Sequence, residues 1–295
     1  MSSLSDAFRT HVQSGLTTLC RAWAVERRDG TVLGFTDHDC VLSFDGLDFQ
    51  PGSGLTARAV QQATGLSVDN TEALGVLSDA AVSEEDIEAG RFDSADVRCW
   101  LVNWQDVTMR WLQFRGSIGE IRRAGGAFEA ELRGLTEALN QPQGRIYQKP
   151  CTAVLGDAAC RFDPAAPGYS EELDAESVER NEVFRWEELP GFAFDWFTGG
   201  RLTVLSGKAE GLWSAIKADQ SGAEGRRITL WEPIRALVVP GDRVRLEAGC
   251  DKRMETCRLK FNNLLNFQGF PDIPGEDWAM AVPRQSGVNT GGSRR

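Results

Sequence analysis

Two Asp-Gly dipeptides near the start of the chain separate short runs of alternating apolar residues, and this pattern restricts the fold more than any other feature. The dipeptides are Asp29-Gly30 and Asp45-Gly46. A tight β-hairpin turn places its central residues at positive φ, which glycine and aspartate tolerate. We therefore expect two antiparallel hairpins, built from the runs 19–25 with 31–36 and 41–44 with 47–49.

The rest of the first half also has the composition of a β-sheet, because aromatic and β-branched residues are frequent in it. Ser83, the three acidic residues after it and Gly90 predict a short helix with an N-cap, a first turn that suits the helix dipole and a glycine end. The predicted strands are 97–104, 111–121 and 128–132, and the predicted short helices are 4–14, 83–89 and 135–140.

The second half has short alternating runs between turn signals, which is typical of a small barrel or sandwich. One segment, 212–218, has a helix-like pattern. Residues 161–190 hold nine carboxylates against three arginines, so we expect a solvated linker there, or a docking surface for a basic partner. The predicted strands are 201–205, 227–231, 236–239 and 243–246.

These patterns predict a mainly β chain with two β-rich, barrel-like or sandwich-like domains, a few short helices and an irregular cysteine-rich C-terminal module. For a length of 295 residues, two domains are the usual expectation. We expect an N-terminal domain at 1–150 and a C-terminal domain at 151–283. Residues 284–295 are rich in glycine, serine and arginine, which predicts a disordered tail.

The charge balance argues against a protein that reads nucleic acid. The chain has 32 basic and 43 acidic residues, a net charge of -11, whereas binding to a phosphate backbone requires cationic surface. No apolar run approaches the ~20 residues of a spanning helix, and the N-terminus lacks a signal-peptide pattern. We expect an unsecreted chain with no membrane span.

Four of the seven cysteines form two pairs, which are the strongest candidates for a metal site. Cys151 and Cys160 have eight residues between them, and Cys250 and Cys257 have six. Zinc knuckles usually have about two to four residues between paired cysteines, so these spacings are wide for zinc. A [4Fe-4S] cluster takes one thiolate per iron and accepts ligands from separate loops. The spacing leaves a cluster, structural zinc, unligated thiols and disulfides as alternatives.

The segment Asp37–Cys40 also groups side chains that can bind a metal, and its Cys-His pair is part of what a cysteine peptidase needs. No third orienting group accompanies the pair, so we interpret the segment as a turn at a strand end. Cys20, Cys40 and Cys99 lie in apolar β-like stretches and are expected to be core residues. The residues expected to fill the core or an assembly interface are Trp23, Trp100, Trp104 and Trp111.

Nine short motifs carry a family resemblance: Gly34–Asp39, Gly65–Asn70, Asp86–Gly90, Tyr147–Cys151, Leu155–Cys160, Gly249–Lys252, Lys260–Asn263, Asn266–Pro271 and Ile273–Gly275. Together they resemble the hub proteins in the tail baseplates of gene transfer agents, which are phage-like particles. The C-terminal motifs are also similar to those of tail-tip proteins from phages with long non-contractile tails. The resemblance extends from about Leu16 to about Gly275.

The resemblance implies a structural protein and not an enzyme. It implies a homotrimeric ring in the tail baseplate, assembled in the bacterial cytoplasm, between the distal tail protein and a central fibre protein. Related tail tips carry a cell-wall peptidase as a separate subunit. The resemblance also implies that a [4Fe-4S] cluster is held by Cys151, Cys160, Cys250 and Cys257.

On this reading the cluster is a structural staple, and the ring helps to form the channel for DNA delivery. Two alternatives remain open. The chain is an iron-sulfur protein for electron transfer or redox sensing, or it is an assembly protein of the same fold with zinc at the four cysteines. Metal analysis separates these alternatives, because zinc is colourless and a [4Fe-4S] cluster is brown.

Overall fold

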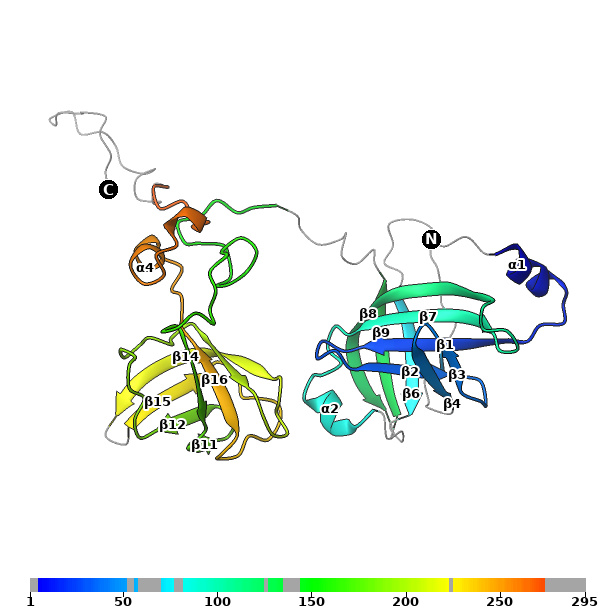
Figure 1. Ribbon diagram of the computed structural model, residues 1–295, viewed down its shortest axis with the longest axis horizontal. Coiled ribbons are helices and arrows are strands. Elements are labelled where there is room, and N and C mark those ends of the chain that lie inside the picture. The colour runs from blue at the N-terminus through cyan, green and yellow to red at the C-terminus, as the bar shows by residue number, and fades with distance from the viewer. Residues whose placement is uncertain are drawn as a thin grey trace, which may run out of the picture. The chain divides into compact units, whose positions relative to one another are not determined.

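The computed structural model describes residues 5–51, 56–57, 70–76, 82–124, 127–134, 144–222 and 225–273. The chain forms two compact units, Met1–Pro142 and Gln143–Arg295. Each unit is built on a β-sheet with few short helices (Figure 1), which confirms the predicted mainly β fold class. In the described parts of the chain, no helix has the length and apolar character needed to span a bilayer.

The strands of the first unit are β1 (Leu19–Glu26), β2 (Val32–Thr36), β3 (Leu42–Phe44), β4 (Leu47–Pro51), β5 (Thr56–Ala57), β6 (Asn70–Val76), β7 (Asp96–Asn103), β8 (Arg110–Ala124) and β9 (Ala127–Gly134). They form a nine-stranded sheet in the order β3-β4-β2-β1-β7-β8-β9-β6-β5. The two predicted hairpins are confirmed, because β1 pairs antiparallel with β2 and β3 with β4. Asp45 and Gly46 have φ values of 52° and 75°, as a tight hairpin turn requires.

Strand β1 is buried on both faces of this sheet. Trp23 and Val25 pack in one apolar cluster, whereas Ala22 and Ala24 pack in a second one, since alternate side chains of a strand point to opposite faces. The second cluster contains Trp100 and the stacked rings of Phe44 and Phe49. The centre of the sheet is therefore held from both sides.

Two short helices accompany the first unit and confirm two of the predicted ones. In α1 (Asp6–Gln13) the N-cap is Ser5, and in α2 (Glu84–Glu88) it is Ser83, whose hydroxyl accepts a hydrogen bond from the Asp86 amide. Gly90, just after α2, has a φ of 73°. The predicted helix 135–140 lies outside the described residues.

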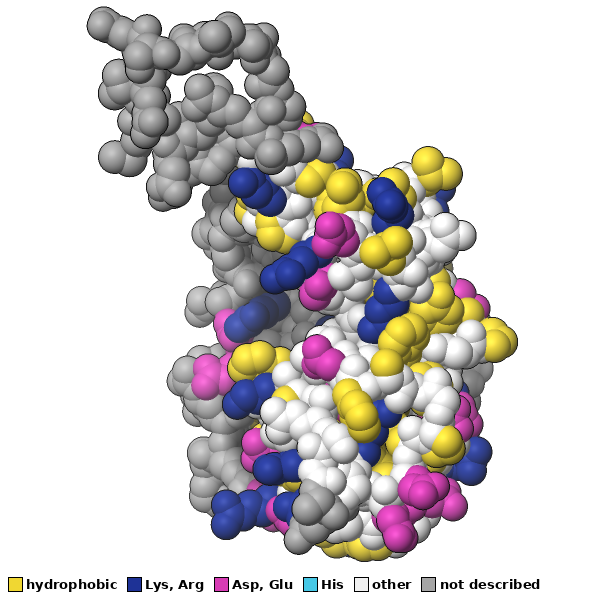
Figure 2. Space-filling view, turned by 90° about the vertical axis from the view of Figure 1, so that its left-hand side faces the viewer, with side chains coloured by type: hydrophobic (Ala, Val, Ile, Leu, Met, Phe, Trp, Pro, Cys, Tyr) yellow, Lys and Arg dark blue, Asp and Glu magenta, His cyan; other side chains and the backbone are white. Residues whose placement is uncertain are grey.

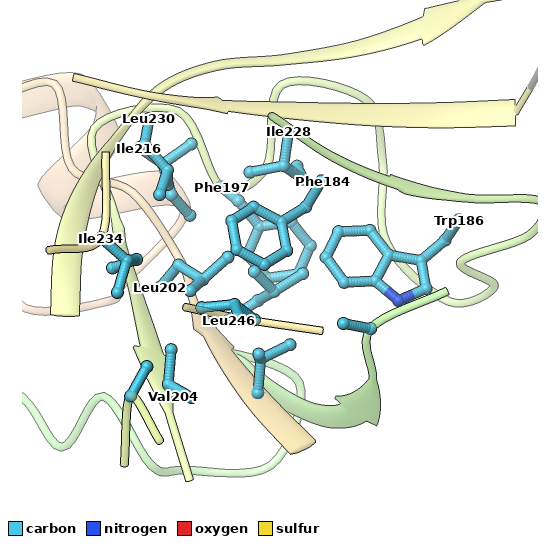
Figure 3. Packing of buried hydrophobic residues seen from close by; sticks show 14 residues of the cluster. Phe184, Trp186, Phe197, Leu202, Val204, Ile216, Ile228, Leu230, Ile234 and Leu246 are labelled. Atoms are coloured by element: carbon cyan, nitrogen blue, oxygen red, sulfur yellow. The ribbon is translucent and has the colours of Figure 1, made fainter. Parts of the chain in front are cut away.

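The strands of the second unit are β10 (Ser170–Asp174), β11 (Ser177–Glu179), β12 (Val183–Trp186), β13 (Arg201–Val204), β14 (Trp213–Gly222), β15 (Gly225–Leu230) and β16 (Arg243–Glu247). The sheet has the order β10-β16-β13-β14-β15-β12-β11, so its two end strands are consecutive in the chain. It curves around one apolar core, in which Phe184, Trp186 and Phe197 face the aliphatic residues of β13 to β16 (Figure 3). We call this curved, open sheet and its core the barrel. The helical segments after the sheet are α4 (Met254–Leu259) and η1 (Leu264–Asn266).

Three predictions for the second half are wrong. Residues 161–190 are not a linker, because they contain β10, β11 and β12, and Phe184 and Trp186 are core residues. Residues 213–218 of the segment 212–218 belong to strand β14 and not to a helix, because Ser214 and Ile216 alternate inward between less buried neighbours. Residues 236–239 form no strand. The predicted tail 284–295 lies outside the described residues.

Candidate metal centre

The residues before and after the second sheet come together at one end of it. We call the segments 144–165 and 250–273 the cysteine module. In Figure 1 they lie side by side, with α4 beside the loop of the first segment. The main chain joins them directly, because the Cys151 amide donates a hydrogen bond of 2.8 Å to the Lys252 carbonyl.

The module brings the two cysteine pairs to one small cavity. All seven cysteines of the chain are described, and all are free thiols. The cavity is lined by Cys151, Ala153, Leu155, Cys160, Cys250, Arg253, Cys257, Phe261, Asn263 and Asn266. Four thiols from two distant segments therefore share one enclosure, which is the arrangement that a metal centre needs.

The loop of the first pair is shaped by Asp157. Its carboxylate accepts hydrogen bonds from the amides of Cys160 at 2.6 Å, Val154 at 2.8 Å and Ala159 at 2.9 Å. These bonds, with that from Cys160 the strongest, lower the pKa of Asp157 below its usual value. The carboxylate thus holds the backbone around Cys160 in a tight turn without any metal.

The second pair, Cys250 and Cys257, is positioned by Asp251, which accepts two hydrogen bonds, and by helix α4. Asp251 accepts hydrogen bonds from the Arg253 amide at 3.0 Å and from the Thr256 hydroxyl at 2.8 Å. This orders the entry to α4, on which Cys257 is buried. Lys252 then crosses to the first segment, where its ammonium donates to the Ala153 carbonyl at 2.6 Å.

Polar groups of the module also reach the sulfur atoms. The side-chain amide of Asn263 lies 3.5 Å from Cys160 Sγ and donates to the Cys160 carbonyl at 2.7 Å. The main-chain amide of Gln268 lies 3.4 Å from Cys151 Sγ, and Cys257 Sγ lies 3.3 Å from the main-chain carbonyl of Asn263. Donors to ligand sulfurs are typical of iron-sulfur sites, where they tune the centre.

Two of the four thiols, those of Cys250 and Cys257, resist deprotonation. Burial, together with the smaller effect of negative charge on Cys250, Cys151 and Cys160, raises the pKa of Cys257 to about 11. Burial also raises the pKa of Cys250. A bound cation reverses this effect, because thiolates are the form that binds metal.

Four cysteine thiolates can bind either a single zinc ion or an iron-sulfur cluster. In donor type and number, the four cysteines fit a polynuclear centre with one thiolate per iron, and the eight and six residues within the two pairs are wide for a zinc knuckle.

Lys260 connects the module to the barrel. The Lys260 ammonium donates to the carbonyl oxygens of Trp196 and Gly249. Gly249 itself lies so close to the barrel that a Cβ atom there would be 1.7 Å from the Thr198 carbonyl oxygen. The motifs Gly249–Lys252 and Lys260–Asn263 were the available signal, but their partners are far away in the sequence.

The three remaining cysteines divide differently from the prediction. Cys20 and Cys99 are buried, as predicted, but Cys40 is exposed because it lies in the loop after β2 and not in a strand. Of the tryptophans in the first unit, Trp23 and Trp100 are core residues, whereas Trp104 is 39% exposed.

Two family models each match a part of the chain, and a solved structure matches nearly all of it. Residues 5–163 match the family model described as "Baseplate hub protein, N-terminal attachment domain". Residues 195–277 match the one described as "Phage conserved hypothetical protein BR0599". A chain in the solved structure "Virion of native gene transfer agent (GTA) particle" is 57% identical, with a TM-score of 0.91 over 98% of this chain and 99% of that one. No curated protein matches.

Proposed function

The chain belongs to the baseplate hub protein family, and we propose that it is the structural hub of a gene transfer agent tail baseplate. The observation that carries this proposal is the 57% identity, over nearly the full length of both chains, to a component of a gene transfer agent virion. The proposed role is structural, and no catalytic step is part of it.

We propose further that three copies form a ring between the distal tail protein and a central fibre protein. The exposed apolar residues of the cysteine module support such an assembly, because contiguous apolar surface is typical of interfaces. Leu265 is fully exposed, and Leu259 and Val154 are 75% and 67% exposed. Figure 2 shows apolar side chains interspersed with basic and acidic ones on one face of the molecule.

The proposed channel for DNA delivery does not depend on free negative charge along β10. Glu172 accepts a hydrogen bond of 2.9 Å from Arg245 Nε and also lies near Arg243. Asp174 lies 3.8 Å from Arg243. The acidic strand is thus partly neutralised by β16, its neighbour in the sheet.

We propose that Cys151, Cys160, Cys250 and Cys257 hold a [4Fe-4S] cluster. The shared cavity and the amide donors to sulfur support this centre, and the wide sequence spacing within each cysteine pair favours it over zinc. When bound, the cluster supplies a cross-link between the two segments of the module. Cys160 and Cys250 have 89 residues between them, and in the chain-entropy view such a cross-link stabilises the fold by about 4 to 5 kcal/mol.

Anaerobic purification followed by iron, sulfide and zinc analysis tests the centre. We expect a brown protein with iron and sulfide, and C250S should be colourless and less stable. Zinc in place of iron would favour the zinc-stapled alternative, and a reversible couple at an accessible potential would favour the redox one. Normal tail assembly by an iron-free C250S protein would contradict the staple.

The oligomeric role has its own test. Mass measurement in solution should show a trimer, alone or together with the distal tail protein. L265D adds a charge to a fully exposed side chain and should weaken ring or fibre assembly without unfolding the chain. An unchanged yield of complete tails with L265D would contradict a role for this apolar surface.

A further inference from the structure

The loop between β2 and β3 gathers three different metal-binding side chains in the first unit. One ligand atom each from His38, Asp39 and Cys40 lies within 4.8 Å of the others, and His38 Nδ1 is 2.8 Å from Asp39 Oδ1. Within the described parts of the chain, no other group of three or more His, Cys, Asp or Glu residues meets this spacing. The loop is remote from the cysteine module in the sequence and is part of a different unit.

The backbone of this loop is fixed by hydrogen bonds that need no metal. The Asp37 carboxylate accepts from the Arg21 amide at 2.6 Å, and the Asp37 amide donates to the Arg21 carbonyl at 3.2 Å. The Thr36 hydroxyl donates to the Arg21 carbonyl at 2.8 Å and accepts from the His38 amide at 3.2 Å. The loop is therefore anchored to β1, a strand that is buried on both faces of the sheet.

Of the three side chains, that of His38 is largely buried and those of Asp39 and Cys40 are exposed. The His38 ring lies 5.0 Å from the Trp104 ring, and its side chain is only 19% exposed. The Asp39 side chain is 85% exposed, and Cys40 is exposed too. The imidazole is therefore held by packing, while the carboxylate and the thiol can adjust to a ligand from solvent.

This donor set matches the preferences of zinc. Zn²⁺ binds thiolate sulfur at about 2.3 Å, imidazole nitrogen at about 2.0 to 2.1 Å and carboxylate oxygen at about 2.0 to 2.2 Å. Bonds of these lengths place tetrahedral ligand atoms roughly 3.3 to 3.8 Å apart, which small rotations of the exposed side chains can reach. We propose that His38, Asp39 and Cys40 form a zinc site with three protein ligands and one open position.

The open position is available to water or to a donor from a neighbouring subunit, since the site faces solvent. Binding replaces the contact between His38 Nδ1 and Asp39 Oδ1 with bonds from both side chains to the metal. The site is independent of the proposed cluster, because it shares no residue with the cysteine module.

Calorimetric titration of the full chain with Zn²⁺ tests the site. H38Q and C40S should each bind one equivalent less than wild type, or bind it more than about tenfold more weakly. H11Q is the matched control, because His11 is the other histidine of the chain and lies outside the loop. The cysteine module is the same in all four proteins, so any metal it takes up cancels in the comparison.

Cobalt provides the second readout. The Co²⁺ spectrum of wild type minus that of C40S should contain a thiolate-to-cobalt charge-transfer band. If H38Q or C40S folds poorly, D39N replaces an exposed side chain and should still weaken zinc binding. Equal zinc stoichiometry and affinity in wild type and D39N, or no thiolate band in the difference spectrum, would overturn the proposal.

Discussion

The Lys260 ammonium lies 2.6 Å from the carbonyl oxygen of Trp196 and 4.3 Å from the centre of its indole ring. It also donates to the Gly249 carbonyl at 2.9 Å. Burial lowers the pKa of Lys260, an effect that the negative charge of Cys250 opposes. Lys260 lies at the end of α4, the helix that carries Cys257. Its side chain therefore connects this helix both to Trp196 of the barrel and to Gly249, the residue before Cys250.

Replacing Lys260 should loosen the module from the barrel. K260M leaves two carbonyl groups without this donor, and an unsatisfied buried polar group costs about 1 to 3 kcal/mol. We expect a lower free energy of unfolding and less iron per chain, measured by denaturant titration and iron analysis. K217M is the control, because Lys217 lies over the exposed ring of Trp231. Equal effects of the two variants would contradict the assignment.

The buried ion pair of Arg226 and Asp219 should be the most sensitive polar contact of the second unit. Its closest N···O distance is 2.6 Å, and the two side chains are 4% and 0% exposed. Arg226 also donates to the carbonyls of Phe192 and Ala193. D219N leaves the guanidinium buried without its counter-charge, so we expect a loss of about 3 to 5 kcal/mol in denaturant unfolding.

The matched control for that pair is E247Q. Glu247 forms a bidentate pair with Arg201, whose side chain is 45% exposed. The Glu247 side chain is 9% exposed, but E247Q leaves behind only the solvent-screened guanidinium of Arg201, so we expect a loss of about 1 kcal/mol or less. A D219N protein as stable as E247Q would show that the buried charge is not decisive.

Asp157 should make the module sensitive to acid. Its folded pKa lies below the usual value of 3.8, so its contribution to stability is present above pH 3.8 and is lost as pH falls through the lowered pKa. D157N should lack this acid transition and retain less iron at neutral pH. Circular dichroism and iron release during acidification measure both effects. An acid transition of unchanged size in D157N would assign it to another carboxylate.

Thiol reactivity should separate the three cysteines of the first unit. Burial raises the pKa of Cys99 to about 12 and that of Cys20 to about 11, whereas Cys40 is exposed. At pH 8, peptide mapping after alkylation should show rapid labelling of Cys40 alone among these three. The raised pKa values stabilise the fold below pH 9, and this contribution is lost as pH rises from 9 towards 12. Rapid labelling of Cys99 in folded protein would contradict its burial.

Local signals predicted the hairpins and short helices of the first unit well. The turn at Asp45-Gly46 needs only two residues of positive φ, and the N-cap of α2 needs only Ser83 and a nearby amide. Such features depend on residues a few positions apart. The sequence therefore contains all of their determinants within one short window.

Long-range pairing explains the errors in the second half. Glu172 looks like part of a solvated run until it is placed beside Arg245, which is 73 residues away and belongs to the neighbouring strand. The charges of β10 therefore belong to a sheet face and not to a linker. No local pattern reveals that pairing.

The candidate centre was predictable in its cysteines but not in their surroundings. Spacing and family motifs singled out the four thiols, and the structure places them around one cavity. The Asn263 amide reaches Cys160 across 103 residues, and Lys260 reaches Trp196 across 64. Contacts of this range are decided by the tertiary fold.

The antiparallel pair of β10 and β16 has a mechanical consequence for a tail tip. Ser170, at the start of β10, lies opposite Glu247, at the end of β16, so the chain enters and leaves the module at the same end of the pair. The Ala248 amide closes this end by donating to the Tyr169 carbonyl at 2.7 Å. A pull on the module therefore runs along both strands together, perpendicular to the hydrogen bonds that join them to the sheet. Such a load must shear many bonds at once and cannot open them one by one, so the attachment resists traction.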